Sequence, residues 1–212
     1  MKNYKKYWFF AIIFTSFQYQ IYGQVDSIYY KSGELKAYGE TQNQLKTGQW
    51  TYFYPSGKIN SIQEYSSGKL NGKITNHYTN GQISAVENWK KDELQGKAVY
   101  FYENGQIEKQ GEYLNSNYHS QWDFFYENGR LRQIGNYENG LPDGPWQYFN
   151  KEGQIVQTGS YSEGKEEGLW QYFDEKGRKT YEGQYNNGEK VGDWYFFNRF
   201  GKKKLIDKTE IN

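Results

Sequence analysis

The chain has no cysteine, only three prolines and only two histidines among its 212 residues, and each scarcity removes a class of protein. Without cysteine there is no disulfide framework, no thiolate metal site and no lipid-modified N-terminal cysteine. The two histidines belong to no H-E-x-x-H or phosphate-loop motif. The sequence therefore predicts a non-enzymatic protein with no catalytic residues, no cofactor and no metal site.

Long apolar runs are also missing, since the longest, Tyr7 to Phe17, has 11 residues. A helix that spans a bilayer needs roughly 20. Three lysines precede this run, and Gly23 is small enough to precede a cleavage site, so residues 1–23 are predicted to be a signal peptide cut between Gly23 and Gln24. A retained N-terminal anchor is the alternative. Cleavage predicts an exported protein, periplasmic or extracellular, that no longer associates with a membrane.

Neither sign of charge dominates. The whole chain has 26 basic and 25 acidic residues, and the first 23 residues hold three lysines and no acid, so the processed chain has 26 − 3 = 23 basic and 25 acidic residues, a net charge of −2. Its only basic run is Lys202–Lys204. Nucleic-acid binders usually show a clustered basic face. No nucleic-acid partner is predicted.

Glycine and aromatic residues are abundant, with 24 Gly and 20% aromatics, and they recur with a period of 24 residues. One glycine opens each unit, Ser120 being the single interior substitution: Gly48, Gly72, Gly96, Gly144, Gly168 and Gly192. A second glycine follows nine residues later: Gly33, Gly57, Gly81, Gly105, Gly129, Gly153, Gly177 and Gly201. Residues 24–207 are therefore predicted to be a tandem repeat domain, followed by a short tail, 208–212.

Each unit is predicted to be a β-hairpin, because an alternating aromatic run precedes the second glycine and another extended run follows it, as in "YFYENGQIEKQGEY". Tyr54-Pro55-Ser56-Gly57 fits a type I turn with glycine in the left-handed conformation. The turn between units is expected to be looser. About 15 strands in sequence order predict an all-β fold, an elongated single-layer antiparallel meander.

Two closed architectures compete with this open meander. Propeller blades need about 40 residues, which argues against a propeller. A closed barrel is harder to exclude, but the terminal units carry Asp26 where others carry Trp and Lys203 where others carry Ile or Leu. Polar end strands are how open arrays avoid edge-to-edge association.

The units "GQYNNGEKVGDWYFFNRFGKKK" and "GNYENGLPDGPWQYFNKEGQIVQTG" resemble MORN repeats, closest to the bacterial variant with the pattern G-x-Y-x-x-G-x-x-x-G-x-W-x-Y-F. The resemblance covers residues 24 to about 207. It implies an elongated β-sheet that serves as a scaffold or protein-interaction module, sometimes near membranes; some bacterial relatives are antitoxins. The chain departs from the pattern at Ile74 and Ala98, where Trp is missing, and at Trp89, where Trp replaces Tyr.

Two histidines and a row of acids are candidates for chemistry. His77 occupies the slot that holds Phe in other units, which favours a packing role. His119 is expected in a turn beside Ser120 with no recurring carboxylate to orient it. Glu103, Glu127 and Glu175 recur at one turn position, and a regular row of solvated acids is not a buried pair with split pKa values.

Alternation along the strands places the Trp and Tyr residues on one face and a Phe row, from Phe53 to Phe197, on the other. Each Phe is expected to pair with the residue six further on, as Phe149 with Ile155. Either row can serve as packing between repeats or as a binding strip. The candidate partner-binding residues are Trp122, Trp146, Trp170, Trp194, Tyr148 and Tyr172.

These features predict an exported interaction scaffold whose partner is a protein of unknown identity. An alternative is a carbohydrate-binding module with a cell-wall glycan as partner, because "GQWTYFYPSGKI" also resembles the aromatic hairpins of choline-binding wall repeats. A further alternative is an antitoxin or immunity-type binder, although a signal peptide does not fit a cytoplasmic antitoxin.

Overall fold

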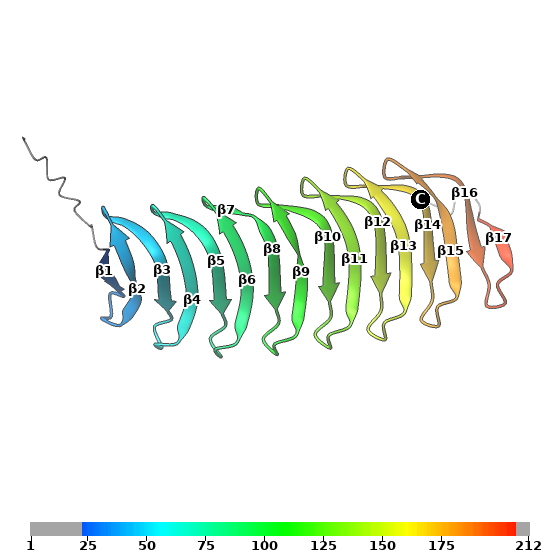
Figure 1. Ribbon diagram of the computed structural model, residues 1–212. Coiled ribbons are helices and arrows are strands. Elements are labelled where there is room, and N and C mark those ends of the chain that lie inside the picture. The colour runs from blue at the N-terminus through cyan, green and yellow to red at the C-terminus, as the bar shows by residue number, and fades with distance from the viewer. Residues whose placement is uncertain (1–22, 207–212) are drawn as a thin grey trace, which may run out of the picture.

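A computed structural model describes residues 23–206 of the chain (Figure 1). The predicted signal peptide lies outside the described residues except for Gly23, and the predicted tail, 208–212, lies outside them entirely. In the described part the chain forms strands and turns only, and no helix is long and apolar enough to span a bilayer.

The described chain forms one open antiparallel sheet of 17 strands in meander order. Its first half comprises β1 (Gln24–Tyr29), β2 (Leu35–Gln42), β3 (Leu45–Phe53), β4 (Ile59–Ser66), β5 (Lys69–His77), β6 (Ile83–Lys90), β7 (Glu93–Leu94), β8 (Gly96–Phe101) and β9 (Ile107–Leu114). Its second half comprises β10 (Asn117–Phe125), β11 (Leu131–Glu138), β12 (Leu141–Phe149), β13 (Ile155–Ser162), β14 (Lys165–Phe173), β15 (Lys179–Asn186), β16 (Glu189–Phe197) and β17 (Lys203–Leu205).

The hairpins stand side by side in a single row, with β1 and β17 at opposite ends (Figure 1). Consecutive strands pair with one another except β7 and β8, which both pair with β6. The predicted single-layer meander is therefore confirmed, and the closed alternatives are wrong. The strand number exceeds the predicted 15 partly because Gln95 interrupts the ladder and separates the two-residue β7 from β8.

The register follows the predicted pairing of the Phe row. Phe149 pairs with Ile155 and Phe125 with Leu131, in each case six residues apart across the glycine turn. His77 pairs with Ile83 in the same way, so it does occupy the Phe slot. His119 lies within β10 rather than in a turn, and its Nδ1 is 3.4 Å from the Glu138 carboxylate.

The turns lie along the two long edges of the sheet (Figure 1). All eight of the predicted turn glycines have positive φ, between 73° and 103°. The turns on the opposite edge are tighter than expected: Asn139 and Gly140, with φ of 52° and 83°, form a two-residue loop between β11 and β12. Positive φ at both positions is typical of a type I′ turn, whose twist matches that of the strands.

A recurring tyrosine ties each glycine turn to the next hairpin. The Tyr102 hydroxyl donates to the Phe125 carbonyl at 2.8 Å, and Tyr126 does the same to Phe149. From Asn150 onward the slot holds Asn or Asp, and Asp174 accepts hydrogen bonds from its own loop instead. In the N-terminal and central units these bonds add a side-chain link between neighbouring hairpins to the backbone ladder.

Replacing Gly105 by Val is expected to destabilise its hairpin by about 1–3 kcal/mol, because a β-branched residue is strained at positive φ. Gly105 has φ of 84°, and its N–H donates to the Tyr102 carbonyl at 2.9 Å. Thermal or urea denaturation measures the change. A variant that melts like the parent would contradict the turn assignment.

Candidate functional site

The tryptophans lie flat against glycines of the preceding strand. Gly135 in β11 pairs with Trp146 in β12, and a Cβ on Gly135 would lie 2.2 Å from the indole. The indole Nε1 donates to the Asn136 carbonyl at 3.2 Å. The same close approach of a glycine to an indole occurs in five units, although the Trp194 Nε1 has no hydrogen-bond partner among the described residues: Gly39 with Trp50, Gly111 with Trp122, Gly135 with Trp146, Gly159 with Trp170 and Gly183 with Trp194. Each indole is thus fixed in the sheet rather than projecting from it.

Pairs of tyrosines close over these tryptophans. The hydroxyls of Tyr148 and Tyr161 are 3.2 Å apart, and both rings contact Trp146, with centroid separations of 5.8 and 5.3 Å. Equivalent hydroxyl pairs join Tyr52 to Tyr65, Tyr100 to Tyr113 and Tyr172 to Tyr185. The hydroxyl contacts orient the tyrosine rings at four places along the sheet.

Burial raises the pKa of several tyrosines on this side of the sheet, so these stay neutral over the physiological pH range. Burial, with the Tyr52 hydroxyl adding to it, raises the pKa of Tyr65 to about 12, and burial raises the pKa of Tyr137 to about 12. The pKa values of Tyr148 and Tyr172 are also raised, for the same first cause. Hydroxyl-to-hydroxyl contacts can therefore persist without charge repulsion.

This burial is at odds with the prediction that the four tryptophans contact a partner. Trp122, Trp146, Trp170 and Trp194 are only 0%, 4%, 0% and 5% exposed. An indole with so little surface cannot act as an anchor in a partner's pocket unless the sheet rearranges, so the packing alternative fits them better. Tyr148 and Tyr172 are half-buried and stay candidates. The name aromatic face is used below for the side of the sheet that carries these rings.

Two central units lack the glycine–tryptophan pair. Gln63 and Glu87 stand in the glycine position, and Ile74 and Ala98, 11 residues later, stand in the tryptophan position. Gln63 and Ile74 are register partners, and Ile74 in turn pairs with Glu87. Side chains from the glycine position thus replace the missing indoles on the aromatic face.

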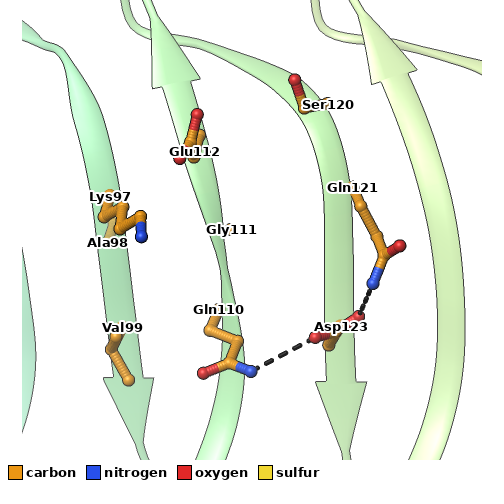
Figure 2. Close-up of a pocket in the computed structure, with 9 residues that line it drawn as sticks. All are labelled: Lys97, Ala98, Val99, Gln110, Gly111, Glu112, Ser120, Gln121 and Asp123. Atoms are coloured by element: carbon orange, nitrogen blue, oxygen red, sulfur yellow. Dashed lines mark hydrogen bonds between the residues drawn. The ribbon is translucent and has the colours of Figure 1, made fainter.

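The opposite face carries a hollow of about 420 Å³ above Gly111 (Figure 2). Gln110 and Glu112 flank Gly111 and so point away from Trp122. Its lining comprises Lys97, Ala98, Val99, Gln110, Gly111, Glu112, Ser120, Gln121 and Asp123. The Asp123 carboxylate accepts hydrogen bonds from Gln121 at 2.7 Å and from Gln110 at 3.2 Å. The hollow therefore presents hydrogen-bonding groups beside the aliphatic Ala98 and Val99, and no aromatic residue is among its lining residues.

Sequence reasoning identified neither the hollow nor the glycine–tryptophan contact. Two motif departures border the hollow, Ala98 and Ser120, and Ser120 keeps the positive φ, 58°, of the glycine that it replaces. Within residues 23–206 no cluster of three His, Cys, Asp or Glu residues is placed to hold a metal ion.

These features define a β-hairpin repeat protein in which tryptophans and tyrosines of successive repeats pack along one face of the sheet. Four stretches, residues 46–67, 94–115, 119–139 and 142–163, match the family model described as MORN repeat variant, and the chain carries MORN repeats of this variant. MORN repeats are generally modules for protein or membrane interaction. No curated protein matches the chain.

Several solved structures show weak likeness to the chain. A mutant of TarM from S. aureus, in complex with Fondaparinux, alpha-GlcNAc-glycerol and UDP, is 19% identical over 51% of this chain and 21% of its own, with a TM-score of 0.32. A porin-like protein from Bacteroides uniformis is 12% identical over 80% and 86%, with a TM-score of 0.21. TcdB2-TccC3 is 12% identical over 82% of this chain and 13% of its own, with a TM-score of 0.19. The chain thus covers only 21% of the length of the TarM chain and 13% of that of the TcdB2-TccC3 chain.

Proposed function

We propose that the protein is a non-enzymatic exported scaffold that binds another protein along its aromatic face. The observation that supports this is the layer of paired tyrosines, in which Tyr148 and Tyr172 are only partly buried and their hydroxyls contact those of neighbouring tyrosines. A ring already fixed in orientation loses little conformational entropy when a partner covers it. Tyrosine also offers a large amphipathic contact area.

The length of the sheet suits an extended partner. Neighbouring strands lie about 4.8 Å apart, and β7 and β8 share one place in the row, so the 17 strands give a platform of roughly 70 Å. The two tyrosines occupy equivalent positions in adjacent repeats, so they are spaced by two strands, or roughly 10 Å. A partner in extended conformation could contact both of them in sequence.

Export is supported by the place where the sheet begins. β1 starts at Gln24, the residue that the expected cleavage would leave at the N-terminus. The processed chain would then begin directly with its first strand. We infer a periplasmic or extracellular location, and N-terminal sequencing of protein from its own host tests it: a soluble chain retaining Met1 would overturn the inference.

The partner is tested by capture from an envelope extract on immobilised protein, with a glycan array run in parallel. We expect a protein partner to be retained by the parent chain and by Asp123→Asn, which changes only the hollow on the opposite face. Replacing Tyr148 and Tyr172 by Ala should reduce capture several-fold in the folded fraction. Binding to glycans alone would overturn the proposal in favour of a wall-binding module. If the tyrosine variant captures as much partner as the parent chain, the aromatic face is not the binding surface.

A further inference from the structure

The interruption of the aromatic face places a carboxylate among aromatic rings. Glu87 accepts a hydrogen bond from the Tyr100 hydroxyl at 2.7 Å through one oxygen and from the Trp89 indole at 3.2 Å through the other. Ala98 leaves this position without its usual indole. Glu87, Trp89, Ala98 and Tyr100 are called the Glu87 cluster below. Glu87, Trp89 and Tyr100 are each only partly buried, so the cluster is accessible from the aromatic face.

The same face already holds ammonium groups of this chain against its rings. Lys46 Nζ lies 4.5 to 5.0 Å from the ring centroids of Trp50, Tyr52 and Tyr65. Lys109 Nζ lies 4.4 Å from the ring centroid of Tyr100, and Lys190 Nζ lies 5.3 Å from that of Trp194. The face therefore binds lysine side chains intramolecularly at three places along its length.

The Glu87 cluster has the rings of such a site and a carboxylate in addition. Among residues 23–206 no ion pair within 4.0 Å joins Glu87 to a cation. The nearby Lys109 lies against the Tyr100 ring, but its Nζ donates to the Tyr118 hydroxyl at 2.7 Å rather than pairing with Glu87. The carboxylate is bonded only to neutral donors, and a partly buried charge of this kind gains from a cation at close range.

We propose that the Glu87 cluster binds the side-chain ammonium of a lysine presented by the partner protein. This inference rests on the proposed function, which supplies the partner. The ammonium would donate to the Glu87 carboxylate and lie against the Trp89 ring, combining an ion pair with cation–π attraction. The cluster would thus fix where the partner lies on the sheet and select a positively charged residue at that point.

A capped trilysine peptide serves as the probe, with the same peptide acetylated on each side-chain nitrogen as the neutral control. The Trp89 indole N–H signal in the NMR spectrum of the processed protein should shift in a saturable way with trilysine and stay fixed with the acetylated peptide. Glu87→Gln should weaken binding about tenfold or more. Glu166→Gln, which removes a carboxylate from another repeat, should bind trilysine as the parent does.

A second variant guards against a folding defect. Glu87→Gly with Ala98→Trp rebuilds the glycine–tryptophan pair of the neighbouring units, so it should melt at the same or a higher temperature and no longer bind trilysine. Unchanged affinity in either Glu87 variant would overturn the inference. Partner capture that persists in Glu87→Gln would refute the cluster as the partner site while leaving the scaffold function in place. If trilysine binds but no partner protein is captured, the Glu87 cluster stands as an ammonium site and the proposed scaffold function is refuted.

Discussion

Gly159→Ala is expected to lower the free energy of unfolding by about 3 kcal/mol, the upper end of what overpacking costs. A Cβ on Gly159 would lie 2.1 Å from Cδ2 of Trp170. The indole cannot withdraw easily, because its Nε1 donates to the Ser160 carbonyl at 3.2 Å and the ring contacts Tyr161 and Tyr185. Urea denaturation monitored by tryptophan fluorescence gives the change.

A double-mutant cycle tests whether the glycine matters only because of its tryptophan. Gly159→Glu with Trp170→Ala copies the Glu87 and Ala98 arrangement that the chain itself uses, so it should be more stable than the sum of its single changes predicts. A coupling energy of about 1–3 kcal/mol is expected for residues in direct contact. Additive effects would show that the glycine is required for another reason.

The repeat period and the strand register were predictable because both follow from local chemistry. Glycines nine residues after each unit's start fix the turn, and a fixed turn length fixes the pairing of Phe149 with Ile155. The chain needs no distant contact to settle these choices. The two-residue turn at Asn139 and Gly140 could also have been predicted, since an Asn-Gly pair between runs of alternating apolar and polar residues is a strong hairpin signal.

The burial of the tryptophans was harder to predict, because alternation assigns a face and not a depth. Depth depends on what the neighbouring strand leaves empty, and here that is the missing Cβ of a glycine 11 residues earlier. A usable signal did exist in the sequence. Where Gln63 and Glu87 replace the glycine, Ile74 and Ala98 replace the tryptophan. The paired change identifies the two positions as contacting residues.

The hollow above Gly111 had no sequence signal of its own. Its lining comes from three strands, β8, β9 and β10, and includes the side chains of Lys97 and Gln121 (Figure 2). Neither the separation of these residues in the sequence nor their position in the repeat indicates how their side chains lie. The two motif departures beside it, Ala98 and Ser120, are visible in the sequence, but nothing in the repeat pattern says that they border one depression.

Trp170→Ala is expected to cost about 4 kcal/mol, the range for deleting a buried tryptophan side chain. The side chain is fully buried, and its removal leaves a cavity between Tyr161 and Tyr185 and an unpaired carbonyl at Ser160. Because repeat arrays lose stability unit by unit, hydrogen exchange should accelerate mainly in residues 155–197. Leu169→Ala is the matched control, since its side chain is 48% exposed on the other face of the same strand.

The same variant separates packing from partner binding at this position. If Trp170 serves only to pack the sheet, partner capture should fall in proportion to the unfolded fraction and recover at lower temperature. A loss of capture in protein whose hydrogen exchange matches the parent would show instead that the indole reaches the partner, through a rearrangement of Tyr161 or Tyr185. The tyrosine layer would then act as a cover over Trp170 that opens on binding.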